Sequence, residues 1–219
     1  MEDDDQTQNL LQWIIEAAGM RAEIYRTGDE FLRAFRRGAT LTGSDGAAPT
    51  PSCLVCNVVL PQTSGLDLYE SYKSDGGRLP IIFLAAHADV PMAVRALKSG
   101  AAEFVEIPFN RNDLLERIQR AVRRDAARRR DERALRDLDD RFAALTQRER
   151  EVLDGLQRGW PNREIARQAG VTVRAVEMRR AGLMKKMNAG SLAELLHLAW
   201  RRESRTPPPF NPPTAAGCG

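Results

Sequence analysis

Hydrophobic positions in the first half of the chain follow two different periods, which predict alternating helices and strands. Residues 6–19 carry apolar side chains at helical spacing and end on Gly19, a residue typical of the position just after a helix. Residues 52–59 and 79–86 are instead continuous apolar runs bounded by turn-forming residues. Runs of this kind are typical of strands that are buried on both faces of a parallel sheet.

The segments around these runs extend the alternation. The pattern predicts further strands at 22–25 and 103–107 and helices at 28–37, 66–74, 90–99 and 112–122. Strands that alternate with helices are the signature of a doubly wound α/β domain. We therefore predict such a domain over residues 1–123.

The next segment, residues 124–140, is dense in charge, contains neither Gly nor Pro and is rich in helix-forming residues. Acidic and basic residues three or four positions apart favour an exposed helix, so we predict a helical linker that continues the preceding helix. Leu135, Leu138 and Phe142 form a short apolar seam near its end. At the other end of the chain, residues 206–219 are Pro-rich and predicted to be a disordered tail.

Between linker and tail, residues 141–205 show four helical segments with short breaks, an all-α pattern. Thr146 with Glu149 predicts a capping box for the first helix, and Asn162, Thr172 and Ser191 are predicted to cap the other three. The break at 170–172 matches the tight turn of a helix-turn-helix motif. The motif makes residues 173–187 the recognition helix.

The predicted recognition helix has two faces. Val173, Val176, Leu183 and Met187 follow helical spacing and are expected to pack inward. The residues expected to face outward are Arg174, Glu177, Met178, Arg179, Arg180, Ala181, Lys185 and Lys186. Spread basic residues suit phosphate contacts, whereas middle positions of such a helix face base edges. The alternative is a small helical bundle with a cationic surface, which the coincidence of caps, tight turn and basic helix disfavours.

The balance of charge also changes near residue 141, where the predicted all-α segment begins. Residues 1–140 hold 19 Lys and Arg against 23 Asp and Glu, whereas residues 141–205 hold 14 against 7. A basic domain attached to an acidic one suits a polyanionic partner such as double-stranded DNA. The acidic N-terminus is unlike a signal peptide, and no apolar stretch is long enough for a membrane span. With an odd number of cysteines, we expect a cytoplasmic protein without a disulfide scaffold.

Residues 145–187, LTQREREVLDGLQRGWPNREIARQAGVTVRAVEMRRAGLMKKM, resemble the LuxR-type output domain of response regulators of the NarL/FixJ group. The resemblance implies base-edge contacts from Glu177, Met178 and Ala181 and phosphate contacts from Arg174, Arg179 and Lys185. It also implies binding as a homodimer to two half-sites, with the last helix helping to pair the two copies. The sequence departs from the family pattern at Ala175, Arg179 and Ala181, which leaves the target DNA sequence open.

The α/β half resembles the receiver domain of the same regulators, through LVCNVVLPQTSGLDLYE and PIIFLAAHADVPMAVRALKSGAAEFVEIPF. In the family, an Asp accepts a phosphoryl group, two further acids help hold Mg²⁺, a hydroxyl reads the phosphoryl group and a Lys pairs with its charge. The resemblance places the acceptor at Asn57, the hydroxyl at Ala85, the Lys at Ile107 and the acid pair at Glu2 and Asp3, or at Asp3 and Asp4.

Three of these positions lack the group that the reaction needs. An amide cannot form an acyl phosphate, Ala85 has no hydroxyl, and Ile107 has no charge. We therefore interpret this half as a pseudo-receiver that holds no metal or other cofactor. The resemblance also begins at the acid pair, so the apolar first strand that normally precedes it is missing, although that strand is central in a sheet of order 2-1-3-4-5.

Cys53 and Cys56 form a C-x-x-C motif, but they lie in a strand pattern without a second ligand pair, which favours a structural role. No nucleophile and base pair or phosphate-binding Gly loop suggests an enzyme. The sequence as a whole predicts a DNA-binding transcription regulator that is not controlled by phosphorylation at the usual position. Two alternatives stay open: an interaction protein that pairs with another regulator and modulates it, and a conventional regulator that a sensor kinase phosphorylates.

Overall fold

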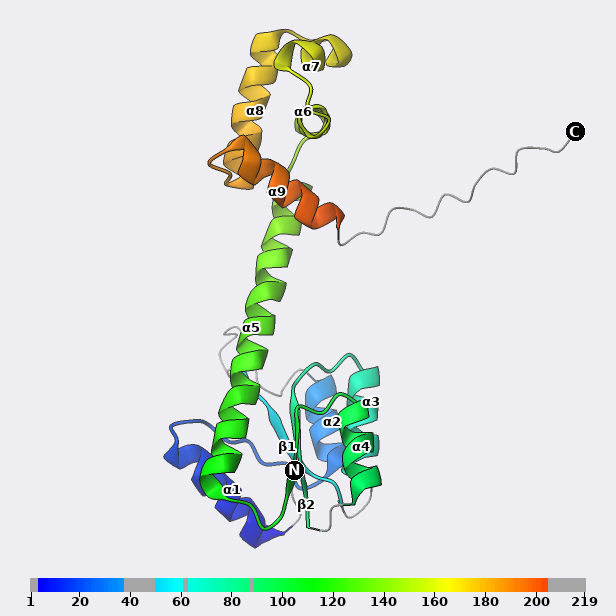
Figure 1. Ribbon diagram of the computed structural model, residues 1–219, viewed down its shortest axis with the longest axis vertical. Helices are drawn as coiled ribbons and strands as arrows, with labels where there is room; N and C mark the ends of the chain where they lie inside the picture. Colours follow the sequence, from blue (N-terminus) through cyan, green and yellow to red (C-terminus); the bar gives the residue numbers. More distant parts are fainter. Residues whose placement is uncertain (1–3, 38–49, 61–62, 87–88, 205–219) are drawn as a thin grey trace, which may run out of the picture. The chain divides into compact units, whose positions relative to one another are not determined.

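The computed structural model describes residues 4–37, 50–60, 63–86 and 89–204. The chain divides into two compact units, Met1–Arg130 and Asp131–Gly219 (Figure 1). The boundary between the two units lies inside the segment predicted as a linker. The predicted tail, residues 206–219, lies outside the described residues.

The N-terminal unit is built on a parallel sheet. Its strands are β1 (Leu54–Asn57), β2 (Ile81–Ala85) and β3 (Glu103–Glu106), in the order β1-β2-β3. Every residue of β2 is buried, because β2 is the middle strand and helices cover both faces of the sheet. The predicted fold class is confirmed, and both continuous apolar runs contain strands.

Helices cover the sheet in two layers. α2 (Gly28–Arg36), α3 (Gly65–Ser74) and α4 (Val90–Lys98) pack on one face around Phe31, Tyr69, Tyr72 and Phe83. α1 (Asp5–Ala17) and the first part of α5 (Arg111–Ala143) pack on the other face, around Leu11, Leu84, Leu114 and Ile118. Alternate side chains of β2 point into the two layers, as the period of a strand requires.

The strand predicted at residues 22–25 is wrong. Among the described residues these four form no strand, and β1 lies at the edge of the sheet with no strand between it and this segment. A strand persists only when a neighbour pairs with its main chain, and periodicity alone does not supply one.

α5 is continuous from Arg111 to Ala143 and carries one buried carboxylate in the N-terminal unit. Asp125 accepts hydrogen bonds from the main-chain N–H of Ser52, at 3.0 Å, and from Arg129 Nε, at 2.5 Å, and it pairs with Arg128. A buried carboxylate is stable only when such partners compensate its lost hydration. Asp125 therefore fastens the chain that enters β1 to α5.

The C-terminal unit is helical. Its helices are α6 (Gln147–Gln157), α7 (Asn162–Ala169), α8 (Val173–Met187) and α9 (Leu192–Glu203), joined by the last turns of α5. A single apolar cluster includes Leu138 and Phe142 of α5 together with Leu183 and Leu195. Two residues of the predicted apolar seam thus belong to the core of this unit, and Leu135 is half-buried.

The predicted caps of this unit are confirmed at three helices out of four. Thr146 and Glu149 form a capping box, and Thr172 and Ser191 accept hydrogen bonds from the main chains of Ala175 and Glu194. Asn162 is wrong as a cap, because Pro161 occupies that position and makes no side-chain bond. Proline has no N–H and a fixed φ, so it starts this helix one residue earlier than its polar neighbour suggests.

Candidate DNA-binding surface and receiver edge

The helix-turn-helix geometry is present at the predicted place. α7 ends at Gly170, whose φ of 63° lies in the left-handed region that favours glycine, and α8 begins after Thr172. The connection is therefore a tight turn of three residues. α8 ends at Asn188, the one non-glycine residue with a positive φ among the described residues.

α8 buries one face in the unit. Val176, Leu183 and Met187 are fully buried there, as predicted. Val173 was also predicted to pack inward, and this is wrong, because its side chain is 38% exposed. Val173 is the first residue of the helix and follows the turn directly, so helical spacing counted backward from Val176 overstates its burial.

The opposite face of α8 is open to solvent. The residues that are exposed on it and that the sequence singled out are Arg174, Glu177, Met178, Ala181 and Lys185. They recur three or four positions apart and therefore form one stripe along the helix. Met178 is 70% exposed, although a large apolar side chain gains from burial. Arg179 and Arg180 flank the stripe and are half-buried.

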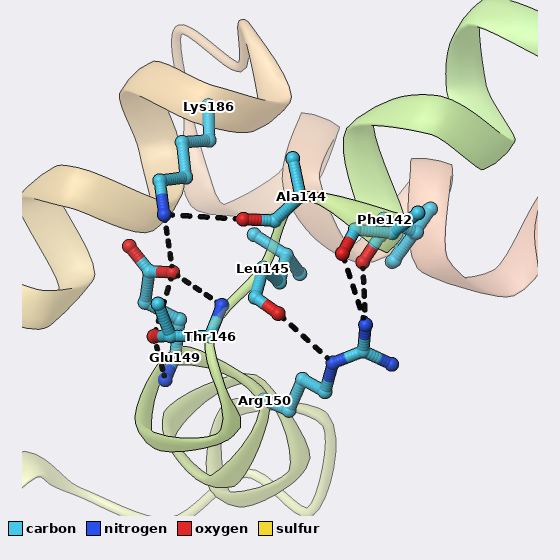
Figure 2. Close-up of polar contacts among 8 residues, drawn as sticks. Phe142, Ala144, Leu145, Thr146, Glu149, Arg150 and Lys186 are labelled. Atoms are coloured by element: carbon cyan, nitrogen blue, oxygen red, sulfur yellow. Dashed lines mark hydrogen bonds and ion pairs between the residues drawn. The ribbon is translucent and has the colours of Figure 1, made fainter.

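Lys186 was expected to face outward with this stripe, and it is exposed as predicted, but its ammonium group bonds within the unit. Its Nζ lies 2.7 Å from Glu149 Oε2 and donates to the main-chain oxygen of Ala144 at 3.2 Å (Figure 2). Glu149 also accepts a hydrogen bond from Thr146 N at 2.8 Å. The end of α8 is thus joined to the start of α6 through one carboxylate. Residues 149 and 186 are too far apart in sequence for a local pattern to pair them.

Two arginines add further bonds near the ends of α5 and α8. We call the polar contacts of Glu149, Lys186, Arg150 and Arg141 the Glu149 framework. Figure 2 shows the Arg150 guanidinium donating to the main-chain oxygens of Leu145 and Phe142, each at 3.1 Å. Arg141 donates to the main-chain oxygen of Met187 at 3.3 Å. Phe142 and Met187 lie at the ends of α5 and α8, where main-chain oxygens have no partner within their own helix, and Leu145 lies in the connection to α6. The end of α8 is therefore bonded to the end of α5 and to the start of α6.

The Glu149 carboxylate is the titratable group of this framework. Burial by itself raises the pKa of Glu149, but hydrogen bonds from Lys186 and Thr146 outweigh it, so the pKa lies below its usual value. The group stays ionised at neutral pH and keeps Lys186 in place.

In the N-terminal unit, the structure brings three receiver positions to one edge of the sheet. Asn57 ends β1, Ala85 ends β2, and Ile107 follows β3, so all three lie at the carboxyl ends of parallel strands. Ile107 N donates to Ala85 O at 2.8 Å, and Asn57 Oδ1 accepts from Val59 N at 3.1 Å. Gly65 packs so closely on the main-chain oxygen of Asn57 that a side chain there would collide with it.

The three receiver positions at this edge carry an amide, a methyl group and an alkyl chain, none of which is the anionic oxygen ligand that Mg²⁺ prefers. Within the described ranges there is no cluster of three or more metal-binding residues. Glu2 and Asp3, the predicted acid pair, lie outside the described residues. Asp4 caps α1, and the hydrogen bonds that it accepts from Thr7 hold its pKa below the usual value.

The two cysteines of the C-x-x-C motif are at least partly buried in the N-terminal unit. Cys56 is fully buried in the core, and Cys53 is half-buried. Burial raises the pKa of Cys53 to about 12, and the nearby Asp125 charge adds to the effect. A thiol with such a pKa is hardly ever in the reactive thiolate form.

Two family models match this chain. Residues 1–119 match the response regulator receiver domain, and residues 143–199 match the bacterial regulatory proteins of the luxR family. The chain belongs to the response regulators. This response regulator joins a receiver domain to a LuxR-type output domain, as the sequence predicted.

Two relatives match most of this chain. The transcriptional regulatory protein FixJ of Azorhizobium caulinodans is 35% identical over 199 residues, which is 91% of this chain and 89% of FixJ. The response regulator protein TodT of Pseudomonas putida is 29% identical over 201 residues, covering 92% of this chain and 84% of TodT. The response regulator described here is accordingly a DNA-binding transcription factor, and its receiver domain implies a kinase partner.

Two solved structures resemble most of this chain. The response regulator StyR has a TM-score of 0.79 at 33% identity, with 92% of this chain and 96% of StyR covered. Full-length FixJ from B. japonicum has a TM-score of 0.53 at 33% identity, with coverage of 93% and 95%. Within the described part of this response regulator, no helix is long and apolar enough to cross a membrane.

Proposed function

We propose that this response regulator controls transcription as a homodimer that reads two DNA half-sites, without phosphoryl control at Asn57. The exposed stripe of α8 carries the proposal. In this reading α8 lies in the major groove, where a helix fits and base edges carry a distinct donor and acceptor pattern. We take residues 141–205 as the working DNA-binding domain, residues 124–140 as its linker, and the cytoplasm as its location.

Roles on the stripe follow from side-chain chemistry. Glu177, Met178 and Ala181 lie in the middle of the exposed face and are assigned to base edges because of that central position. Arg174 and Lys185 lie nearer its ends and are assigned to phosphates. A Met and an Ala offer apolar contact, which suits a thymine methyl group.

Arg179 and Arg180 are assigned to phosphates along the flank of the stripe. Nη1 of Arg179 is buried and has no hydrogen-bond partner among the described residues. A buried guanidinium nitrogen without a partner is costly, so a rotamer that reaches a phosphate is favoured when DNA is present.

The absence of phosphoryl control rests on three positions taken together. The amide of Asn57 cannot accept a phosphoryl group as a carboxylate does, and neither Ala85 nor Ile107 supplies a hydroxyl or a charge at the same edge. A single substitution would leave part of the site, whereas these three remove the acceptor, the sensor and the counter-charge.

The test is selection of bound sequences from a random duplex pool with the untreated full chain. We expect enrichment of a motif with two half-sites about one helical turn apart. We also expect binding to be unchanged after acetyl phosphate treatment. Enrichment of no motif would contradict the DNA reading, and a motif that appears only after acetyl phosphate treatment would contradict the absence of phosphoryl control.

A further inference from the structure

The part of α5 that belongs to the N-terminal unit ends in an arginine-rich segment, residues 123–130. This segment contains five arginines and one acid, Asp125. The sequence pattern predicted an exposed helix in which acidic and basic side chains pair with one another. Asp125 is instead buried, at 1% exposure, where it pairs with Arg128 and Arg129. The single acid of the segment therefore does not neutralise the outer face of the helix.

Three arginines of this segment lie on its outer face without a counter-charge. Arg123, Arg124 and Arg130 are exposed, and their side chains make no hydrogen bond or ion pair with any residue in the described ranges. Their positions lie on one side of the helix, because one turn takes about 3.6 residues. Like charges on one side of a helix repel one another, so the binding of a polyanion is favourable here.

Ala127 lies between these three residues on the helix surface, and we call Arg123, Arg124, Ala127 and Arg130 the arginine face. Ala127 is exposed, and its methyl group leaves room for a partner to approach the helix closely. At a rise of about 1.5 Å per residue, Arg123 and Arg130 are about 10 Å apart along the helix axis. Phosphates of one DNA strand recur about every 3.4 Å of duplex, so the face matches the length of about three phosphates.

We propose that the arginine face binds the phosphate backbone of the DNA that flanks the two half-sites. This inference rests on the proposed DNA binding by α8 and adds a second contact region, which belongs to the N-terminal unit. A guanidinium group suits phosphate because it combines a permanent charge with two parallel N–H donors. Phosphates carry no sequence information, so the contact adds affinity and salt dependence without changing the preferred sequence.

The length of the chain limits how far the arginine face can lie from bound DNA. Only residues 131–140 come between Arg130 and the predicted DNA-binding domain, residues 141–205. Even when fully extended, a chain of this length spans at most about 40 Å. That distance corresponds to about 12 base pairs at about 3.4 Å each. Phosphates within a half-site are those that α8 and its unit occupy, so the nearest free phosphates lie in the flanking DNA.

The test measures the DNA affinity of the full chain by fluorescence anisotropy on two duplexes that carry the selected motif. The short duplex, of about 20 base pairs, ends at the outer edges of the half-sites, and the long duplex extends to about 60 base pairs. We expect the triple variant Arg123→Ala, Arg124→Ala and Arg130→Ala to bind the long duplex at least about tenfold more weakly than the parent chain. Its salt dependence should be smaller by about two to three phosphate contacts. On the short duplex, the triple variant and the parent chain should bind alike.

Lys185→Ala separates this inference from the proposed function on which it rests. Because Lys185 lies on α8, its loss should weaken binding to both duplexes by the same factor. If Lys185→Ala changes binding to neither duplex, the assignment of α8 is contradicted. If the triple variant binds the long duplex as the parent chain does, or loses affinity equally on both duplexes, the arginine face does not bind flanking DNA and the inference is overturned.

A matched control removes three positive charges from the opposite side of the N-terminal unit. Arg33→Ala, Lys73→Ala and Lys98→Ala change exposed residues of α2, α3 and α4 and should together leave binding to both duplexes unchanged. An equal loss in this control would show an effect of net charge and overturn the inference. Replacement of the three arginines of the face by lysine keeps the charge and should retain most of the affinity for the long duplex.

A single position tests the same face without the removal of an arginine. Ala127→Glu places a negative charge at the centre of the arginine face, and Ala127→Gln places a neutral side chain of nearly the same size there. Both new side chains favour a helix. We expect Ala127→Glu to bind the long duplex about fivefold more weakly and Ala127→Gln to bind it as the parent chain does. Equal binding by the two variants would overturn the inference. If circular dichroism shows that the triple variant fails to fold, this pair carries the test.

A competing occupant of the arginine face is the acidic surface of a second copy of this chain. Sedimentation equilibrium of the parent chain and the triple variant, both without DNA, tests it. We expect the two to have the same oligomeric state. Dissociation of the triple variant, together with an equal loss of affinity on both duplexes, would show that the face pairs two copies and would overturn the inference.

Discussion

The two units differ in how their apolar cores are packed and in the side chains that their candidate sites carry. The C-terminal unit has one apolar cluster, and Arg141, Arg150 and Lys186 bond to main-chain oxygens or to Glu149 near the ends of α5, α6 and α8. The N-terminal unit has two clusters on the faces of a sheet, a cavity beside β1, and a sheet edge that carries Asn57, Ala85 and Ile107. The comparison teaches that the exposed stripe of α8 rests on a well-packed and well-bonded base, whereas the receiver fold is kept around a sheet edge whose residue types differ from the family pattern.

The largest expected effect tests whether packing differs between the units. Leu183→Ala is expected to lower the free energy of unfolding by about 4 kcal/mol, because Leu183 is fully buried in the C-terminal cluster. Leu11→Ala should cost about 2 kcal/mol, because Leu11 already borders the cavity and has fewer packing partners to lose. Urea unfolding of the full chain, followed by circular dichroism, measures both. Equal losses would contradict the comparison.

A smaller effect concerns DNA affinity. Lys185→Ala and Arg174→Ala should each weaken binding about tenfold across all sequences and reduce the salt dependence by about one phosphate contact. Met178→Ala should instead change which base pair is preferred. Electrophoretic mobility shifts at several salt concentrations separate the two classes. The exposed Lys98 of α4 supplies the control, and Lys98→Ala should bind DNA as the parent chain does.

The Glu149 framework predicts a pH dependence of the C-terminal unit. Because the folded pKa of Glu149 is lowered, its contribution to stability is complete above the usual value of 4.5 and is lost as the pH falls through the folded pKa. Glu149→Gln should remove about 1 kcal/mol at neutral pH and flatten the stability below pH of about 5.

Thermal unfolding between neutral and acidic pH measures this loss. Glu151→Gln is the control, since Glu151 lies in the same helix and pairs with Arg148 outside the framework. If Glu149→Gln and Glu151→Gln shift the melting temperature alike at every pH, the framework has no special role.

The last prediction is a substitution that is expected to have no effect on phosphorylation. Asn57→Asp restores the acceptor carboxylate, yet we expect no phosphorylation by acetyl phosphate, because Ala85 and Ile107 leave the edge without a hydroxyl and a counter-charge. Intact-mass spectrometry of the treated chain measures it. Phosphorylation of the single variant would show that Asn57 alone separates this domain from an active receiver.

Local sequence patterns determined much of this protein. Continuous apolar runs predicted β1 and β2, and caps at Thr146, Thr172 and Ser191 located the starts of three helices, because these signals act over a few residues. The absence of a hydroxyl at Ala85 and of a charge at Ile107 is likewise a property of residue type.

Tertiary structure decided what depends on neighbours that are distant in sequence. Residues 22–25 have a strand pattern but form no strand, because no partner strand lies beside them among the described residues. The position of Lys186 in the sequence is typical of a DNA-facing residue, but its side chain pairs with Glu149, which another helix brings within 2.7 Å. Pairing and burial are properties of contacts between segments, and a periodic pattern specifies only the face on which a side chain lies.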